Sequence, residues 1–284
     1  MRLGAHMSVS GGKHFALIRG KEIGCEAIQV FIRSVRSWSS KPLDQEDIES
    51  FLEKKEEINE IWPIITHNSY LINLASQDTE KLEKSYNAML DELNKAEQLK
   101  ITYANMHPGV IPKVNENISS KEAMNQITDQ LNKLITATKN SNVIVLFETT
   151  AGQGKGLGHK FEHMKYMIDK IKNKQRIGVC FDTAHSFAAG YDFTTKKKYD
   201  AIWESFDDII GLKYLKAFHL NDTDKGCGSR VDRHAHIGKG KIGKEPFRFL
   251  VNDDRFKDLP GILETPEGDK MFETNLNFLK GLRK

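Results

Sequence analysis

Seven side chains of metal-ligand type each come directly after a short apolar stretch of this sequence: His6, His67, His107, Glu148, Asp182, His219 and Glu264. Two short patterns add more, since His185 follows Asp182 after two residues and His234 follows Asp232 after one. Imidazole and carboxylate ligands without cysteine suit Zn²⁺, Mn²⁺ or Fe²⁺, and so large a set could hold more than one ion. A single histidine in such a place is as often a hydrogen-bonded polar residue as a ligand. Seven at equivalent positions predict a common metal site.

The apolar stretches themselves predict eight buried strands. They are continuous runs of β-branched and apolar residues, as expected for strands that are covered on both faces of a parallel sheet. The eight stretches are Leu3–Ala5, Ala27–Ile32, Pro63–Thr66, Ile101–Met106, Val143–Phe147, Ile177–Phe181, Leu215–Phe218 and Gly261–Leu263.

Most of the segments between these strands have the pattern of amphipathic helices. Within 78–99, apolar residues recur every three or four positions, and Ser119 followed by Glu122 predicts the N-terminus of another helix. Strand and helix alternate eight times, which predicts an α/β fold, the TIM (β/α)8 barrel, as a single catalytic domain over residues 1–284. Active sites of this fold lie at the C-terminal mouth of the strands, where the seven ligand types would converge.

The composition is that of an ordinary globular protein, with 39% hydrophobic and 29% charged residues. No apolar run approaches the roughly 20 residues that cross a membrane, so no membrane partner is expected. The first apolar stretch begins at Leu3, and the 3 cysteines have no paired spacing. We therefore expect no signal or transit peptide and a reduced, cytoplasmic protein. The net charge of +3 permits nucleic-acid binding without arguing for it.

Nucleophilic mechanisms find little support in the sequence. It has neither a Gly-x-Ser-x-Gly motif nor a P-loop motif. Cys180 falls inside a predicted strand, where we expect a core residue. The glycine-rich run Ala151–Gly156 follows Glu148 but lacks the P-loop spacing, which favours a flexible active-site loop.

Longer motifs resemble the endonuclease IV family, and the resemblance extends over almost the whole chain. Several of these motifs are long enough to be specific when they occur together. They are Gly4–His6 with Gly11-Gly12, Thr66–Leu74, Met106–Gly109, Phe147–Gly154, Cys180–His185, Phe187–Asp192, His219–Asp222, Ser229–His234 and Leu263–Thr265.

This resemblance implies a DNA repair endonuclease that hydrolyses the phosphodiester on the 5′ side of an abasic site by means of a multinuclear zinc-activated hydroxide. Its products would be a 3′-hydroxyl and a 5′-deoxyribose phosphate, and 3′-end-trimming phosphodiesterase activity is also expected. The implied partner is double-stranded DNA that contains abasic sites. No obligate protein partner is implied, and we expect a monomer.

The resemblance also implies a site of three zinc ions, in which manganese or iron could substitute. The first ion would be held by His67, His107 and Glu148. The second would share Glu148 and be completed by Asp182, His219 and Glu264. The third would be held by His185, Asp232 and His234. The residues predicted to be catalytic, which hold the two ions that activate water, are Glu148, Glu264, His107 and Asp182.

In this family, loops after the second and third strands enter the minor groove of DNA. The corresponding residues here are Arg36, Trp38, Tyr70 and Leu71. Planar and apolar groups of this kind suit wedging between unstacked bases. Arg230 and Arg233 are predicted to contact phosphates. The alternative is that Tyr70 and Leu71 pack in the core, and that Arg36 belongs with Arg33 to an ordinary solvated loop.

The sequence departs from the family pattern at two places. Ser34 and Ser37 stand where the family has longer amide side chains, so contacts of the first DNA loop would be lost. Asn68 stands beside His67 where the family has Asp, which removes a negative charge near the metals. Neither departure affects a predicted ligand.

Two other functions compete with the nuclease. Sugar isomerases and epimerases of related barrels place a single divalent ion at the same mouth, but they have no use for the Asp232 and His234 pair. A non-catalytic DNA-binding barrel would keep the fold without the chemistry. The intact ligand set argues against it, because a polar cluster without metal is costly to hold together.

Overall fold

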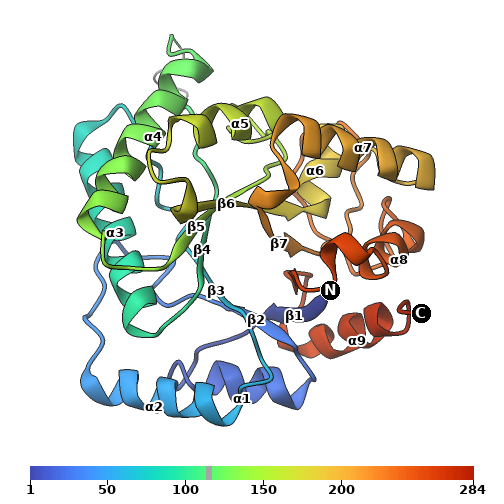
Figure 1. Cartoon of the computed structure of the whole chain (residues 1–284), viewed down its shortest axis with the longest axis horizontal. Coiled ribbons are helices and arrows are strands. Elements are labelled where there is room, and N and C mark those ends of the chain that lie inside the picture. Colours follow the sequence, from blue (N-terminus) through green and yellow to red (C-terminus); the bar gives the residue numbers. More distant parts are fainter. Residues whose placement is uncertain (113–116) are drawn as a thin grey trace.

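Eight parallel strands form a closed barrel in the computed structural model, which describes residues 1–112 and 117–284 (Figure 1). The strands pair in chain order, and the last also pairs with the first. They are β1 (Arg2–His6), β2 (Ala27–Val30), β3 (Ile64–His67), β4 (Tyr103–Met106), β5 (Ile144–Glu148), β6 (Ile177–Asp182), β7 (Leu215–His219) and β8 (Pro260–Leu263). The predicted (β/α)8 barrel is confirmed, and every predicted strand overlaps an observed one. That residues 1–284 make up one catalytic domain stays a prediction.

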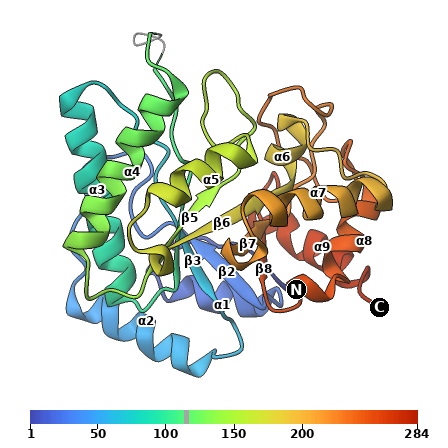
Figure 2. The same ribbon diagram turned by 45° about the horizontal axis from the view of Figure 1, so that its top comes forward.

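Helices surround the barrel on its outside (Figure 2). In the described part of the chain they are α1 (Phe15–Glu22), α2 (Gln45–Glu57), α3 (Thr79–Gln98), α4 (Ser120–Ala137), α5 (Phe161–Lys170), α6 (Thr183–Ala189), α7 (Lys196–Ile209), α8 (Lys244–Val251) and α9 (Asp269–Lys280). The predicted cap of α4 is confirmed, because Ser119 and Glu122 form a reciprocal capping box. Asp78 caps α3 by accepting a hydrogen bond from the Lys81 backbone.

Side chains that fill the interior of the barrel make a small apolar layer. It consists of Ala27, Ile65, Leu146, Cys180, Ala217 and Ile262, one from each of six strands. The expectation that Cys180 is a core residue is therefore confirmed, since it is fully buried in this layer. The strands approach each other closely at Gly4, where a Cβ atom would lie 1.7 Å from the carbonyl oxygen of Ala27. Only glycine permits this contact between β1 and β2.

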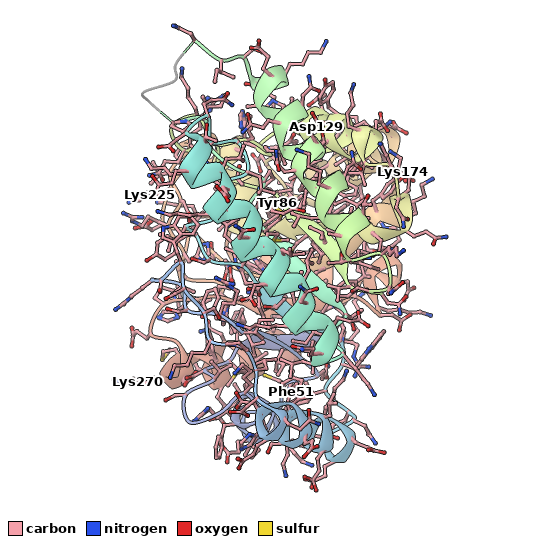
Figure 3. The ribbon with its side chains drawn as sticks, turned by 90° about the vertical axis from the view of Figure 1, so that its left-hand side faces the viewer. Phe51, Tyr86, Asp129, Lys174, Lys225 and Lys270 are labelled. Atoms are coloured by element: carbon pink, nitrogen blue, oxygen red, sulfur yellow. The ribbon has the colours of Figure 1, made fainter. Side chains whose placement is uncertain are left out.

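A larger core lies between the strands and the surrounding helices. Seen from the side, α3 and α4 run next to each other over the barrel wall, with Tyr86 on α3 and Asp129 on α4 (Figure 3). On the other side of the barrel, Phe181 and Phe218 of the strands pack against Trp203 of α7 and against Phe256. Within the described residues, no helix is both long and apolar enough to cross a membrane.

Candidate metal centre

A layer of polar side chains lies next to the apolar layer, towards the C-terminal ends of the strands. Side chains alternate along a strand, so the residue two positions further on points into the barrel again. Two positions beyond the six apolar residues come Gln29, His67, Glu148, Asp182, His219 and Glu264. Five of these six are predicted ligands, so the alternation of side chains brings them together at the mouth.

Three groups of side chains are close enough to share an ion, since within each group the candidate ligand atoms lie within 4.8 Å of one another. The first group is His67, His107 and Glu148. The second is Glu148, Asp182, His219 and Glu264. The third is Asp182, His185 and His234. The remaining predicted ligand is Asp232, whose Oδ1 lies 3.2 Å from Nε2 of His185 and 3.6 Å from Nε2 of His234.

Three of these histidines are oriented by backbone carbonyl groups. Their pairs are Nδ1 of His67 with the oxygen of Asn68 (2.8 Å), Nδ1 of His185 with that of Thr149 (2.9 Å), and Nδ1 of His234 with that of Glu264 (3.1 Å). A carbonyl oxygen only accepts, so each Nδ1 must be the donor. The Nε2 atom of each ring is then left to bind an ion, which is the usual arrangement for metal-binding histidines.

Amide side chains orient the carboxylates. The contacts are Nδ2 of Asn105 to Oε2 of Glu148 (2.6 Å), Nδ2 of Asn221 to Oδ2 of Asp182 (2.8 Å), and Nε2 of Gln29 to Oε1 of Glu264 (2.6 Å). These three amides are not among the residues predicted from the sequence. Gln29 and Asn105 carried a signal nonetheless, because each is a polar residue within an otherwise apolar strand.

The charges in this centre depend on one another. Burial raises the pKa of the Glu148 carboxyl, but the nearby His219 and His107 outweigh burial and hold that pKa well below its usual range. Burial lowers the pKa of His185, yet the charge of Asp182 and its other carboxylate neighbours raise that pKa well above its usual range. The Glu148 carboxylate is thus ionised and attracts positive charge, which protons on the histidines or bound cations can supply.

The donor set fits divalent cations. Oε1 of Glu148, Nδ1 of His219 and Nε2 of His234 are buried and find no hydrogen-bond partner among the described residues. Buried polar atoms without partners are costly, and each of these three belongs to at least one of the ligand groups. Nitrogen and oxygen ligands without sulfur suit zinc, manganese or iron.

Comparisons with known proteins show the family to which the chain belongs. The chain matches the family described as xylose isomerase-like TIM barrel over residues 17–282. A probable endonuclease 4 of Chloroflexus aggregans is 45% identical over 276 residues, which cover 97% of this chain and 95% of the relative. The chain belongs to the endonuclease IV family. The crystal structure of endonuclease IV from Thermus thermophilus has a TM-score of 0.87 and 32% identity, covering 99% of this chain and 98% of that one.

Two further relatives separate similarity in sequence from similarity in fold alone. An apurinic-apyrimidinic endonuclease of Caenorhabditis elegans is 44% identical over 267 residues, which cover 94% of this chain and 66% of the relative. A D-tagatose 3-epimerase-like protein covers 99% of this chain and 97% of its own, with a TM-score of 0.76 but only 19% identity. The likeness to the epimerase therefore concerns the fold, whereas the sequence is that of an endonuclease IV.

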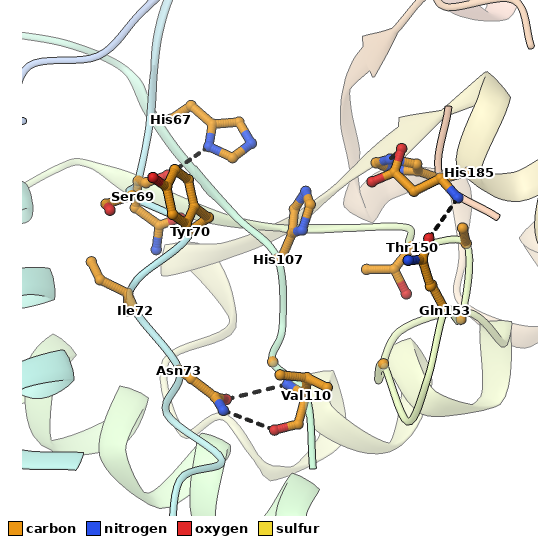
Figure 4. A pocket seen from close by; sticks show the side chains of 16 residues that line it. His67, Ser69, Tyr70, Ile72, Asn73, His107, Val110, Thr150, Gln153 and His185 are labelled. Atoms are coloured by element: carbon orange, nitrogen blue, oxygen red, sulfur yellow. Dashed lines mark hydrogen bonds and ion pairs between the residues drawn. The ribbon is translucent and has the colours of Figure 1, made fainter. Parts of the chain in front are cut away.

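A hollow of about 200 Å³ opens beside the first and third ligand groups (Figure 4). The loops after β3, β4 and β5 form its walls, with Tyr70, Val110 and Gln153 among the lining residues. The side chain of Asn73 donates to the carbonyl oxygen of Val110 over 2.8 Å and accepts from its N–H over 3.2 Å, which joins two of these loops. The glycine-rich run after Glu148 thus lines this hollow, while its role as a flexible active-site loop stays a prediction.

The residues predicted to contact DNA lie around the mouth, and their roles stay predictions. Tyr70 is 72% exposed at the edge of the hollow, so the core-packing alternative does not apply to its ring. Leu71 is half-buried, and Trp38 is half-buried against the core. The remaining three are exposed: Arg36, Arg230 and Arg233.

The structure excludes one alternative and adds detail to two other predictions. Arg33 does not belong to a solvated loop, because its side chain is 4% exposed and forms an ion pair with Asp91. The amide of Asn68 is buried and contacts Sδ of Met89 on α3 at 3.5 Å. His6 follows its strand as predicted but lies outside the three ligand groups, where Nε2 of Gln29 contacts its Nδ1 at 2.9 Å.

Proposed function

We propose that this protein is a metal-dependent DNA repair endonuclease that hydrolyses the phosphodiester on the 5′ side of an abasic site. The products are a 3′-hydroxyl and a 5′-deoxyribose phosphate, and the same centre trims blocked 3′ ends. Membership of the endonuclease IV family supports the reaction class, since its relatives are named endonuclease 4 and apurinic-apyrimidinic endonuclease. The monomeric state and the cytoplasmic location stay predictions.

The position of Glu148 is the observation that carries this proposal. Its Oε2 lies 3.1 Å from Nε2 of His67 and 3.4 Å from Nε2 of His107, while its Oε1 lies 3.1 Å from Nδ1 of His219. One carboxylate thus faces two ligand groups with its two oxygens, as a bridging ligand must. The nine predicted residues would hold three zinc ions. Such ions neutralise charge on a phosphate and lower the pKa of an attacking water.

The protein residues would bind and orient the DNA strand. Tyr70 and Leu71, with Arg36 on the neighbouring loop, would enter the duplex, and Arg230 and Arg233 would contact phosphates. The hollow of about 200 Å³ beside the ligand groups is where the sugar phosphate would lie. An abasic nucleotide also has no base pair to break, so its extrusion costs less.

A nicking assay on matched duplexes tests the proposal. The purified protein is incubated with two duplexes of one sequence, one of which carries a single abasic site, and its metal content is measured in parallel. We expect a nick on the 5′ side of the abasic site only, with a 3′ end that a DNA polymerase extends directly. Equal nicking of both duplexes would contradict abasic specificity. Binding without nicking would indicate a non-catalytic DNA-binding barrel.

A further inference from the structure

A second cluster of buried charges lies outside the metal centre, between α3 and the segment of residues 31–44 that joins β2 to α2, called here the β2–α2 loop. The side chains of Arg33, Glu92 and Lys95 are 4%, 0% and 3% exposed, and Asp91 is 35% exposed. The cluster contains two cations and two carboxyl groups, and burial raises the pKa of the Glu92 carboxyl to about 7. Because the cluster lies apart from the three ligand groups, metal binding does not explain it.

The two cations of this cluster bind the backbone of the β2–α2 loop. Arg33 donates from Nη2 to the carbonyl oxygen of Trp38 over 3.0 Å. Lys95 donates from Nζ to the carbonyl oxygen of Lys41 over 2.6 Å and also to the hydroxyl of Ser40. Asp91 contacts both cations, at 2.9 Å from Nζ of Lys95, and so fixes their positions. Arg33 and Lys95 therefore hold the backbone of the loop at two points, the carbonyl groups of Trp38 and Lys41.

Between positions 34 and 40, Trp38 is the residue of the β2–α2 loop that packs against the core. Four of the loop residues between positions 34 and 40 are serines, whose short side chains bury little surface. Hydrogen bonds within this stretch are confined to short-range contacts, such as the 2.9 Å contact between the Ser37 and Ser39 hydroxyls. Its conformation then depends on Trp38, which packs against the core, and on the buried Arg33 and Lys95, which bind the loop backbone.

The same cluster is connected to the metal centre and to the next loop. Glu92 accepts a hydrogen bond from the hydroxyl of Thr66, which precedes the candidate ligand His67 in β3. The hydroxyl of Ser69, after β3, donates to the carbonyl oxygen of Val35 over 2.9 Å. The β2–α2 loop, the loop after β3 and the strand that ends in His67 are thus joined into one unit.

We propose that Arg33 and Lys95 are positioning residues that hold the β2–α2 loop above the mouth in the conformation that binds duplex DNA. The inference rests on the proposed function, since the loop carries Arg36 and adjoins Tyr70. Replacing a buried ion pair by well-packed apolar residues is often neutral or stabilising, so we assign to this cluster a role in fixing the conformation of the loop and not in stabilising the fold. Arg33 and Lys95 act on DNA affinity through the loop backbone and take no part in the chemical step.

The experiment compares Lys95→Met with Lys81→Met, a matched control on the same helix. Lys81 is 69% exposed and pairs only loosely with Asp78, at 3.6 Å. For each purified protein we would measure Kd and KM for an abasic duplex, kcat, metal content and the hydrogen exchange of backbone amides in 34–41. We expect Lys95→Met to raise Kd and KM roughly tenfold, as expected for hydrogen bonds to a buried charge, with faster exchange in the loop. Metal content and kcat should stay at the parental value, and Lys81→Met should change nothing.

A milder variant keeps the test informative if Lys95→Met does not fold. Ser40→Ala removes one acceptor of Lys95 from a half-buried position and should raise Kd a few-fold, roughly, with kcat unchanged. Unchanged Kd in a folded Lys95→Met, or a fall in kcat at constant Kd, would overturn the inference. Failure of the parent protein to nick abasic DNA would instead refute the proposed function. Even if the parent protein does not nick abasic DNA, the positioning role can still be tested. It would be refuted if the backbone amides of 34–41 in Lys95→Met exchanged hydrogen at the parental rate.

Discussion

Gln29 and His219 are joined by a hydrogen bond of 2.8 Å in which Nε2 of the imidazole donates to Oε1 of the amide. The same ring faces carboxylates with its other nitrogen, since Nδ1 lies 3.1 Å from Oε1 of Glu148 and 3.1 Å from Oε2 of Glu264. The amide oxygen can only accept, so the proton of a neutral ring must be on Nε2. Gln29 thereby leaves the lone pair of Nδ1 pointing into the second ligand group.

The first prediction concerns Gln29→Met, which keeps the volume but removes both polar atoms of the amide. His219 then loses the acceptor that selects its tautomer, and Glu264 loses a donor at 2.6 Å. We expect affinity for the ion in the second group to fall about 10- to 100-fold, as is typical when such an outer partner of a ligand is lost. A competitive titration with a metal indicator would measure it. Parental affinity would show that Gln29 has no part in orienting the ligand.

The second prediction concerns metal content. The protein should purify with more than one equivalent of transition metal, mainly zinc, because nine candidate ligands exceed the needs of one four-coordinate ion. Chelation should abolish cleavage, and added zinc should restore it. The ions should leave more readily in acid, because carboxylates raise the pKa of His185 and its protonated ring cannot bind metal. Full activity with one ion or fewer in elemental analysis would exclude a trinuclear site.

The third prediction separates the ligand groups by mutation. Glu148→Ala and His234→Ala should each lower the cleavage rate at least roughly 100-fold, since each loses part of the electrostatic stabilisation of the transition state. Their metal contents should differ. Glu148 faces two groups and its loss should release more than one ion, whereas His234 belongs to the third group alone. Either variant that retains parental metal content and cleaves at a near-parental rate would disprove the role assigned to that residue.

The sequence predicted the barrel and the ligand set because both depend on local patterns. Each strand is a continuous apolar run. The residue that follows it lies at the mouth of the barrel, and this position does not depend on the conformation of the loops. Gln29 and Asn105 were missed because their role depends on contacts across the barrel, such as the 2.6 Å contact of Asn105 with Glu148. The burial of Arg33 could not be predicted either. Its partner Asp91 is 58 residues away, and only the packing of α3 beside the loop brings them together.

The last prediction tests how the two loops at the mouth act on DNA. Arg36→Ala and Tyr70→Ala should lower cleavage of an abasic duplex by weakening the complex in which the nucleotide is extruded. Unstacking a base step costs a few kcal/mol, and inserted side chains offset part of that cost. Metal content should not change, because Arg36 is exposed and Tyr70 is 72% exposed, and neither belongs to a ligand group.

Cleavage is compared for the parent and both variants on duplexes with and without one abasic site, at two salt concentrations. Binding should weaken as salt rises, because basic residues near the mouth displace counterions from phosphates. Parental cleavage by both variants would rule out the insertion mechanism, even if the metal centre is as proposed.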